Sequence, residues 1–360
     1  MKPLIAVPSI IFLVYRARRG LTPPGLFVAF ITAVIHALHP WSAPFVLLAI
    51  FYFGATKATK VKHNVKARLT LSATGGAGAE GPRNYIQVLA NSYMASFLVL
   101  LQTALLVRKG EYSSTCFGKG KGVEDLLAVG IVANYAAAAA DTYASELGIL
   151  SRSKPRLITS PTLRTVPPGT NGGVSAAGLL ASVFGAFTIA LGSVLFLPFC
   201  DESWSFGDRV QWVVVVTLWG TFGSLLDSFL GGLLQASVVD KQSGKIVEGS
   251  GGRRVLIHPS SAEPGITPLG SVNRASGSIN TTEAVANTAT LRGTRFTGSS
   301  AKATSGNAHE TESRQVVSGR DILDNNQVNA LMTGIISIGG IVAAGYYWDV
   351  PWSFGDLLSW

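Results

Sequence analysis

The sequence predicts an all-α protein: a polytopic membrane helix bundle of about seven or eight spans, with a long disordered cytosolic loop before the last span. Of its 360 residues, 48% are hydrophobic and 14% are charged, whereas a soluble domain has roughly 25% charged residues. The apolar residues also gather in blocks long enough to cross a bilayer. The expected surroundings are therefore the lipid bilayer. No nucleic-acid partner is expected, and the oligomeric state is not predicted.

Four apolar blocks approach or exceed the 20 or so residues that a helix needs to cross the hydrocarbon core, and a fifth precedes the C-terminus. They are residues 85–107, 123–140, 174–199, 210–239 and 330–348. Three shorter blocks come first, at residues 4–15, 25–38 and 41–55. We expect these to be short or tilted helices, since Pro8, Pro40 and Pro44 punctuate them. The first block is expected to remain as an anchor or half-span, because no small-residue cleavage site follows it.

The chain divides into a membrane domain over residues 1–239, a low-complexity segment over 240–320, and a polar motif with the last span over 321–360. Ser, Thr, Gly, Asn and Ala dominate residues 240–320, which hold few aromatic residues. Such a segment cannot bury enough apolar surface to fold alone, so we expect it to be disordered. Cys116 and Cys200 have neither metal-binding spacing nor a CxxC pattern, so no cysteine chemistry is expected.

The basic residues predict the orientation of the spans. With eight spans, the loops 16–24, 57–83, 141–170 and 238–328 lie on one side and hold 23 of the 29 Lys and Arg residues, while the other side holds 6. Basic residues favour the cytosol, so the first set of loops is expected to be cytosolic. The endoplasmic reticulum is the expected membrane.

Several polar motifs lie at the cytosolic ends of these spans. A glycine-rich loop with nearby cations is suited to cradle phosphate, because glycines let backbone N–H groups turn toward an anion. Its candidate phosphate-binding residues are Lys66, Arg68, Gly76, Gly78, Glu80, Gly81, Arg83 and Asn84. A flexible juxtamembrane loop would have the same composition. Gln87 and Asn91 continue the stripe of amides that begins at Asn84, and this stripe is expected to face a polar cavity or another helix.

Three acidic residues are the candidate catalytic and Mg²⁺-binding groups: Asp141, Glu146 and Asp227. Carboxylate oxygens are suitable ligands for a Mg²⁺ ion that carries nucleotide phosphates. Asp141 ends a run of five alanines whose small side chains permit close helix packing. A proton or cation path uses the same residue types, so that alternative stays open. Further polar residues are expected in the same cavity: Ser145, Ser228, Gln235, Asp324, Asn325, Asn326 and Asn329.

A second glycine turn precedes a span and adds the phosphate-binding candidates Gly169, Thr170, Asn171 and Gly172. A glycine turn that feeds a helix N-terminus offers N–H donors and the positive end of the helix dipole to an anion. The alternative is a plain helix cap made by Thr170 or Asn171.

Six motifs in this order resemble the transmembrane protein nineteen family of integral membrane proteins, which includes the plant phytyl-phosphate kinase. They are residues 78–84 (GAEGPRN), 87–91 (QVLAN), 140–148 (ADTYASELG), 168–175 (PGTNGGVS), 223–228 (GSLLDS) and 324–329 (DNNQVN), with Lys66 in the preceding basic loop. The resemblance covers most of the chain apart from residues 240–320.

The resemblance implies a kinase that adds a second phosphate to an isoprenyl monophosphate, with a nucleoside triphosphate, CTP, as the donor and co-substrate. Phosphoryl transfer needs mainly positioning and charge stabilisation, so the absence of a dedicated nucleophile is no obstacle. Two other classes stay open. One is a transporter or channel in which the same acids line an ion path, and the other is a non-catalytic membrane protein.

Overall fold

The computed structural model describes residues 3–73, 78, 81–108, 116–120, 122–255 and 314–350. Five of its helices are long and apolar enough to cross a membrane. They are α5 (Tyr85–Arg108), α6 (Val123–Gly148), α7 (Ala176–Phe196), α8 (Phe206–Leu234) and α10 (Asn325–Tyr347). These are the five long predicted spans, so the predicted helical membrane bundle is confirmed.

The three short predicted spans are also helices: α1 (Pro3–Ala17), α2 (Pro23–Leu38) and α3 (Ala43–Lys60). Most of the prolines near them lie where a helix tolerates them. Pro23 and Pro24 open α2 behind the N-cap Thr22, and Pro44 lies in the first turn of α3, where a missing N–H leaves no bond unmade. Among the prolines of α1, α2 and α3, Pro8 is the one that lies beyond the first turn of its helix.

In three of the long helices, one end lies at least five residues from the predicted span boundary. α6 continues past residue 140 to Gly148. α8 ends at Leu234, and strand β4 follows it, so the span does not reach residue 239. α10 begins at Asn325 rather than at residue 330, because Asp324 and Gln327 form a reciprocal capping box there.

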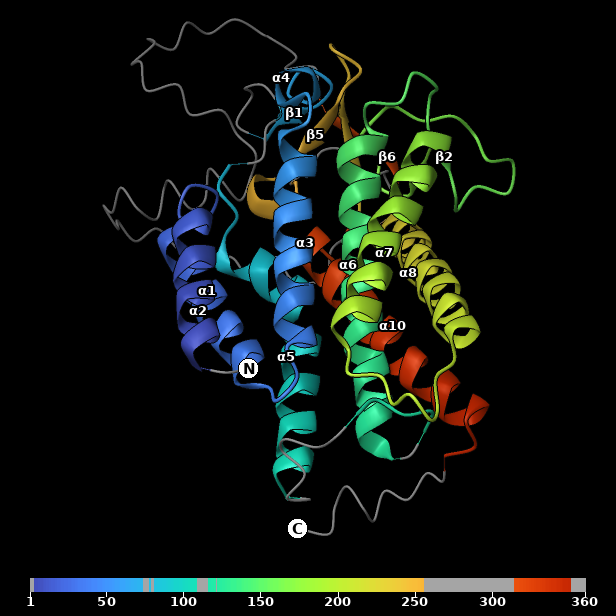
Figure 1. Ribbon diagram of the computed structural model, residues 1–360. Coiled ribbons are helices and arrows are strands. Elements are labelled where there is room, and N and C mark those ends of the chain that lie inside the picture. The colour runs from blue at the N-terminus through green and yellow to red at the C-terminus, as the bar shows by residue number, and fades with distance from the viewer. Residues whose placement is uncertain are drawn as a thin grey trace, which may run out of the picture.

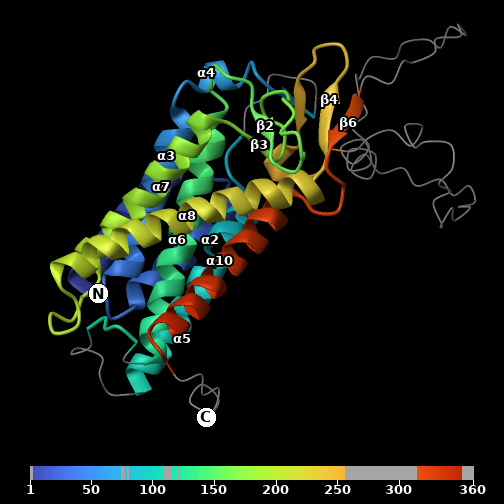
Figure 2. The same ribbon diagram turned by 90° about the vertical axis from the view of Figure 1, so that its right-hand side faces the viewer.

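Helix α6 runs through the middle of the bundle and packs against α3, α5, α7, α8 and α10 (Figures 1 and 2). The five alanines at residues 136–140 are at most 1% exposed. Glycines of the neighbouring helices lie against them: a Cβ at Gly185 would be 2.6 Å from the Ala139 carbonyl oxygen, and one at Gly220 would be 2.8 Å from the Ala136 carbonyl carbon. Small residues thus allow the helix backbones to approach closely, as predicted from the alanine run.

Two small sheets cover the end of the bundle where α6 ends and α5, α7 and α10 begin (Figures 1 and 2). The larger sheet has the order β1-β5-β4-β6, with only β1 and β5 parallel. Its strands are β1 (Leu71–Ser72), β5 (Ile246–Glu248), β4 (Ser237–Asp240) and β6 (Arg314–Ser318). The smaller sheet pairs β2 (Arg156–Leu157) with β3 (Gly173–Val174), and short helix α4 (His63–Lys66) lies at the same end.

The predicted disordered segment 240–320 was too wide, because both of its ends are folded. The described parts of the segment contain β5, the helical turn η1 (Ser250–Gly252) and β6. Ile246 and Val247 of this segment are at most 4% exposed, and the average composition of the segment had hidden this short apolar strand. The remainder, residues 256–313, lies outside the described residues.

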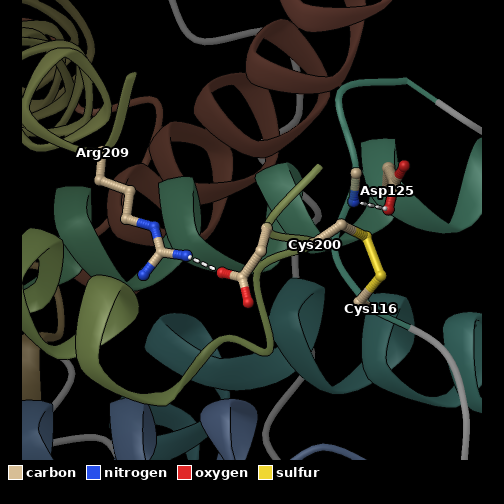
Figure 3. Close-up of a disulfide and its surroundings, with 6 residues drawn as sticks. Cys116, Asp125, Cys200 and Arg209 are labelled. Atoms are coloured by element: carbon tan, nitrogen blue, oxygen red, sulfur yellow. Dashed lines mark hydrogen bonds and ion pairs between the residues drawn. A yellow bond between two sulfur atoms is a disulfide. The ribbon is translucent and has the colours of Figure 1, made fainter. Parts of the chain in front are cut away.

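A disulfide joins Cys116 to Cys200 at the opposite end of the bundle, with an S–S distance of 1.99 Å across 84 residues of chain (Figure 3). The expectation of no cysteine chemistry was therefore wrong. Sequence spacing could not reveal the pairing, because it depends on contact between the α5–α6 and α7–α8 connections. The Phe117 N–H donates to the Pro198 carbonyl from 2.7 Å, and the Cys200 N–H donates to the Phe117 carbonyl from 3.0 Å.

A cluster of aromatic rings surrounds the disulfide. Phe117 is fully buried at its centre. Five rings have centroids between 5.3 and 6.5 Å from that of Phe117, and they belong to Trp41, Phe199, Trp204, Trp212 and Trp348. Aromatic pairs at these separations add stability beyond their buried area, so this cluster connects the α2–α3, α5–α6 and α7–α8 connections with α8 and the end of α10.

We predict that Gly185→Ala destabilises the bundle. The new methyl group would collide with the Ala139 carbonyl oxygen, and overpacking of this kind costs about 1–3 kcal/mol of unfolding free energy. The matched control is Gly207→Ala in α8, where the nearest atom to a new Cβ is the Ser205 hydroxyl oxygen at 3.7 Å. Equal stability of the two variants, measured by denaturant titration in mixed micelles with tryptophan fluorescence, would contradict the close packing of α6.

Candidate functional site

A polar cavity of about 340 Å³ lies under the sheets, among the ends of the long helices. Most of the predicted site residues line it: Arg83, Gln87, Asn91, Asp141, Ser145, Glu146, Gly169, Thr170, Asn171, Gly172, Asp227, Ser228, Gln235, Asp324, Asn325, Asn326 and Asn329. Motifs that are far apart in the sequence therefore meet in one cavity.

Two carboxylates from different helices line the cavity, Asp141 on α6 and Asp227 on α8. The two lie close enough for their negative charges to interact. Ser224, one turn before Asp227 on α8, lines the same cavity. With the Asn329 amide on α10 oriented so that its nitrogen faces acceptors, it donates to Asp227 Oδ2 and to the Asn325 carbonyl, both from 3.1 Å. Three helices that pack on one another thus converge on this pair.

Glu146 lines the same cavity but has different partners. Its carboxylate lies 2.5 Å from Lys66 Nζ, 4.0 Å from an Arg83 nitrogen and 2.6 Å from the Thr59 hydroxyl. The side chains of Lys66 and Glu146 are 10% and 16% exposed, so this is a largely buried ion pair. The charge of Glu146 is therefore neutralised by Lys66, and its contacts connect α6 to α3 and α4.

The predicted three-carboxylate Mg²⁺ site is not assembled. Among the described residues, no three His, Cys, Asp or Glu side chains gather closely enough to hold a metal ion. The pair of Asp141 and Asp227 does fit Mg²⁺ that arrives with a nucleotide, because such ions are usually held by one or two carboxylates together with substrate phosphates. Hydroxyl and amide oxygens in the same lining, those of Ser224, Ser228 and Asn329, suit the same ion.

Two predicted phosphate ligands lie elsewhere. Lys66 is 9% exposed, and besides binding Glu146 it donates to the carbonyls of Ala58 and Thr59 from 3.1 and 2.7 Å. The positive charge of Lys66 is therefore paired inside the protein and does not face the polar cavity. Arg68 is exposed and lines neither this cavity nor the apolar one described below.

The glycine loop before α5 is only partly described, since Gly76 and Glu80 lie outside the described residues. Gly78 is buried, and its N–H donates to the Thr70 carbonyl from 3.1 Å. Gly81 borders a second, apolar cavity. The described glycines therefore do not line the polar cavity, and Arg83 is the one residue among Gly78, Gly81 and Arg83 that does.

Two of the three amides at the start of α5 face the polar cavity, as one alternative predicted. Gln87 and Asn91 line it. Asn84 instead caps α5, because its side chain accepts from the Gln87 N–H at 3.0 Å while the Gln87 side chain accepts from the Asn84 N–H at 2.9 Å.

The second glycine turn lines the cavity but is not the cap of α7. Ser175 is the N-cap and accepts from the Gly178 N–H, so the alternative of a helix cap by Thr170 or Asn171 is wrong. The Asn171 N–H donates to the Ser237 hydroxyl from 2.9 Å, which ties the turn to β4. Gly172 has a φ of +78°, and a Cβ there would lie 2.7 Å from the Gly232 Cα, so a larger residue would push the turn away from α8.

The sequence reasoning missed Arg253, which lines the cavity after β5 and η1. It has no ion pair among the described residues, whereas neighbouring Arg254 lies 3.6 Å from Asp321. The Asn326 amide donates to the Gly251 carbonyl from 3.0 Å and fixes this turn against α10. The signal that could have found Arg253 is residues 249–254 (GSGGRR), a glycine cluster followed by cations like the loop before Arg83.

We predict that Lys66 stabilises the fold and does not bind phosphate. Lys66→Met leaves the Glu146 carboxylate buried without its partner and should lower the unfolding free energy by about 3–5 kcal/mol. The double variant Lys66→Met with Glu146→Gln should recover more than half of that loss. Arg68→Met, a control on an exposed cation of the same loop, should change it by less than about 0.5 kcal/mol. A Lys66→Met protein of unchanged stability would contradict the structural role of the ion pair.

A family model and several known proteins match this chain. The family model described as Integral membrane protein DUF92 matches residues 6–337. Protein PGR of Arabidopsis thaliana is 35% identical over 248 residues, which are 68% of this chain and 82% of that protein. Protein VTE6, chloroplastic, of Arabidopsis thaliana is 29% identical over 171 residues, 48% of this chain and 46% of that protein.

An uncharacterized membrane protein of Methanocaldococcus jannaschii is 43% identical over 107 residues, 30% of this chain and 40% of that protein. No solved structure matches this chain. The family model covers most of the chain and the match to Protein PGR covers most of that relative, which confirms the resemblance to the transmembrane protein nineteen type: the chain belongs to the DUF92 family of integral membrane proteins.

Proposed function

We propose that this membrane protein transfers a phosphoryl group from a nucleoside triphosphate, CTP, to a membrane-embedded prenyl monophosphate. The observation that supports this most is the carboxylate pair of Asp141 and Asp227 in a polar cavity that Arg83 and Arg253 also line. Phosphoryl transfer requires carboxylates for a phosphate-bound divalent cation and cations for the phosphate oxygens. The resemblance to the phytyl-phosphate kinase branch supplies the substrate class.

In this reaction, an oxygen of the prenyl phosphate attacks the γ-phosphorus of the nucleotide. The bond from that phosphorus to the bridging oxygen of the β-phosphate breaks, and the nucleoside diphosphate leaves with the electron pair. The products are a prenyl diphosphate and a nucleoside diphosphate. Mg²⁺, when bound, supplies neutralisation of the charge that builds on the transferred group.

The residues of the chain hold and orient the reactants in this account. Asp141 and Asp227 would hold the cation, and the Asn329 amide would fix the position of Asp227. Arg83, just before α5, and Arg253, just after η1, would contact the phosphates. Ordered donors and fixed charges of this kind lower the barrier because they need no reorganisation during the reaction.

Two independent features support a cytosolic opening of the cavity and a membrane of the secretory pathway, the endoplasmic reticulum. The loops at the cavity end carry the larger share of the basic residues, and such loops favour the cytosol. The disulfide lies at the opposite end, and disulfides persist in oxidising compartments such as the lumen of the endoplasmic reticulum.

The proposal predicts that the purified protein in nanodiscs, with Mg²⁺ and CTP, converts a prenyl monophosphate to the diphosphate. Asp141→Asn and Asp227→Asn should each lower the rate by at least about 100-fold, since each removes charge that holds the cation. The matched control is Asp201→Asn, because Asp201 is 95% exposed, directly follows Cys200 of the disulfide and pairs with Arg209. Mass spectrometry of the lipid products measures the conversion.

Failure of conversion across several prenyl chain lengths and all common nucleoside triphosphates would contradict the kinase proposal. An unchanged rate in Asp141→Asn would remove that carboxylate from the reaction. Ion flux through proteoliposomes that depends on Asp141 and Asp227, without any lipid product, would favour the transporter class instead.

A further inference from the structure

A second cavity, of about 490 Å³, lies among α1, α2, α3 and the start of α5. Its deep walls are apolar, with Leu13, Ala29, Leu48 and Phe51 among them. The outer faces of α1 and α2 are apolar as well: Leu4, Phe12 and Phe27 are 89%, 57% and 66% exposed. In a membrane these faces contact lipid, so the cavity lies on the lipid-facing side of the bundle.

One rim of this cavity is basic. Arg19, Lys60, His63 and Arg83 line it, and its described lining contains no Asp or Glu. The polar cavity differs in this respect, because Asp141, Glu146, Asp227, Glu248 and Asp324 all line it. An apolar interior with a basic rim is complementary to a lipid whose head is an anion.

The two cavities share a wall. Arg83, Gln87 and Asn91 line both. Arg83 is held in place by the α1–α2 connection, since its N–H donates to the Gly20 carbonyl and its carbonyl accepts from the Thr22 N–H, each at 3.0 Å. Its guanidinium also donates to the Thr59 hydroxyl from 3.1 Å. Arg83 can therefore contact ligands in both cavities.

We propose that the apolar cavity binds the hydrocarbon chain of the phosphoryl acceptor, a lipid monophosphate, and that Arg19, Lys60 and Arg83 contact its phosphate. The nucleotide then occupies the polar cavity, and Arg83 lies between the two phosphate groups. Lipid binding in this cavity can be tested by itself, whereas the role of the cavity as the acceptor site rests on the proposed function.

The binding experiment uses the full chain in nanodiscs without nucleotide. The probe is geranylgeranyl monophosphate with a diazirine near the end of its chain, and mass spectrometry identifies the labelled peptides after irradiation. We expect labelling in α1, α2 and α3. Ala29→Trp should lower it about tenfold because the new ring fills the cavity and excludes the chain. Ile31→Trp, on the same helix but 42% exposed, should leave it unchanged.

A second variant tests the basic rim without altering the core. Lys60 is exposed, so Lys60→Gln should fold normally, weaken labelling by the phosphate probe about threefold, and leave labelling by the matching prenyl alcohol unchanged. Excess inorganic phosphate should not displace the lipid probe, which separates a lipid site from a site for free phosphate.

Labelling confined to the outer faces of α7 and α8, or equal labelling in Ala29→Trp and Ile31→Trp, would overturn the proposed lipid site. Because no nucleotide is present, these outcomes are independent of the kinase assay. Labelling in α1 to α3 with no phosphoryl transfer would contradict the proposed function alone. Transfer with labelling elsewhere would contradict the lipid site alone.

Discussion

The close packing of α6 against its neighbours is the constraint on which the rest of the structure depends. Its alanine run contacts glycines of α7 and α8 at distances that no larger side chain permits. This packing brings the end of α6 beside α8, and α10 packs against both. Asp141 lies one residue after the alanine run, so the contacts that hold the bundle together also place the first carboxylate opposite Asp227. A carboxylate is costly in a membrane, and its position beside a second one points to function.

The two ends of the bundle are stabilised by different interactions. At one end, the disulfide joins two of the connections between helices covalently, and the aromatic rings around Phe117 pack against them. At the other end, the helices end in caps, small sheets and the buried Lys66–Glu146 pair. Polar groups at this end line a cavity, whereas those at the disulfide end lie around an aromatic cluster. The molecule is therefore chemically asymmetric along the direction in which it crosses the membrane.

The sequence predicted the helical bundle well, because apolar length alone identifies a membrane span. It also predicted that Asp141, Asp227, Asn329 and the second glycine turn share one site, since charge counting put their loops on one side. The sequence did not predict interactions between residues that are far apart along the chain. Lys66 and Glu146 are 80 residues apart, and nothing local shows that each neutralises the other. The disulfide and Arg253 were missed for similar reasons, one across two loops and the other inside a segment whose composition suggested no structure.

In the proposed reaction, Asp141 and Asp227 together bind a divalent cation that carries a nucleotide. Electron paramagnetic resonance of the full chain with Mn²⁺ and CTP measures this binding, because Mn²⁺ accepts the same oxygen ligands as Mg²⁺. We expect a protein-bound Mn²⁺ signal that requires CTP, is lost in the double variant Asp141→Asn with Asp227→Asn, and persists in Asp201→Asn. An undiminished bound signal in the double variant would show that these two carboxylates do not bind the cation.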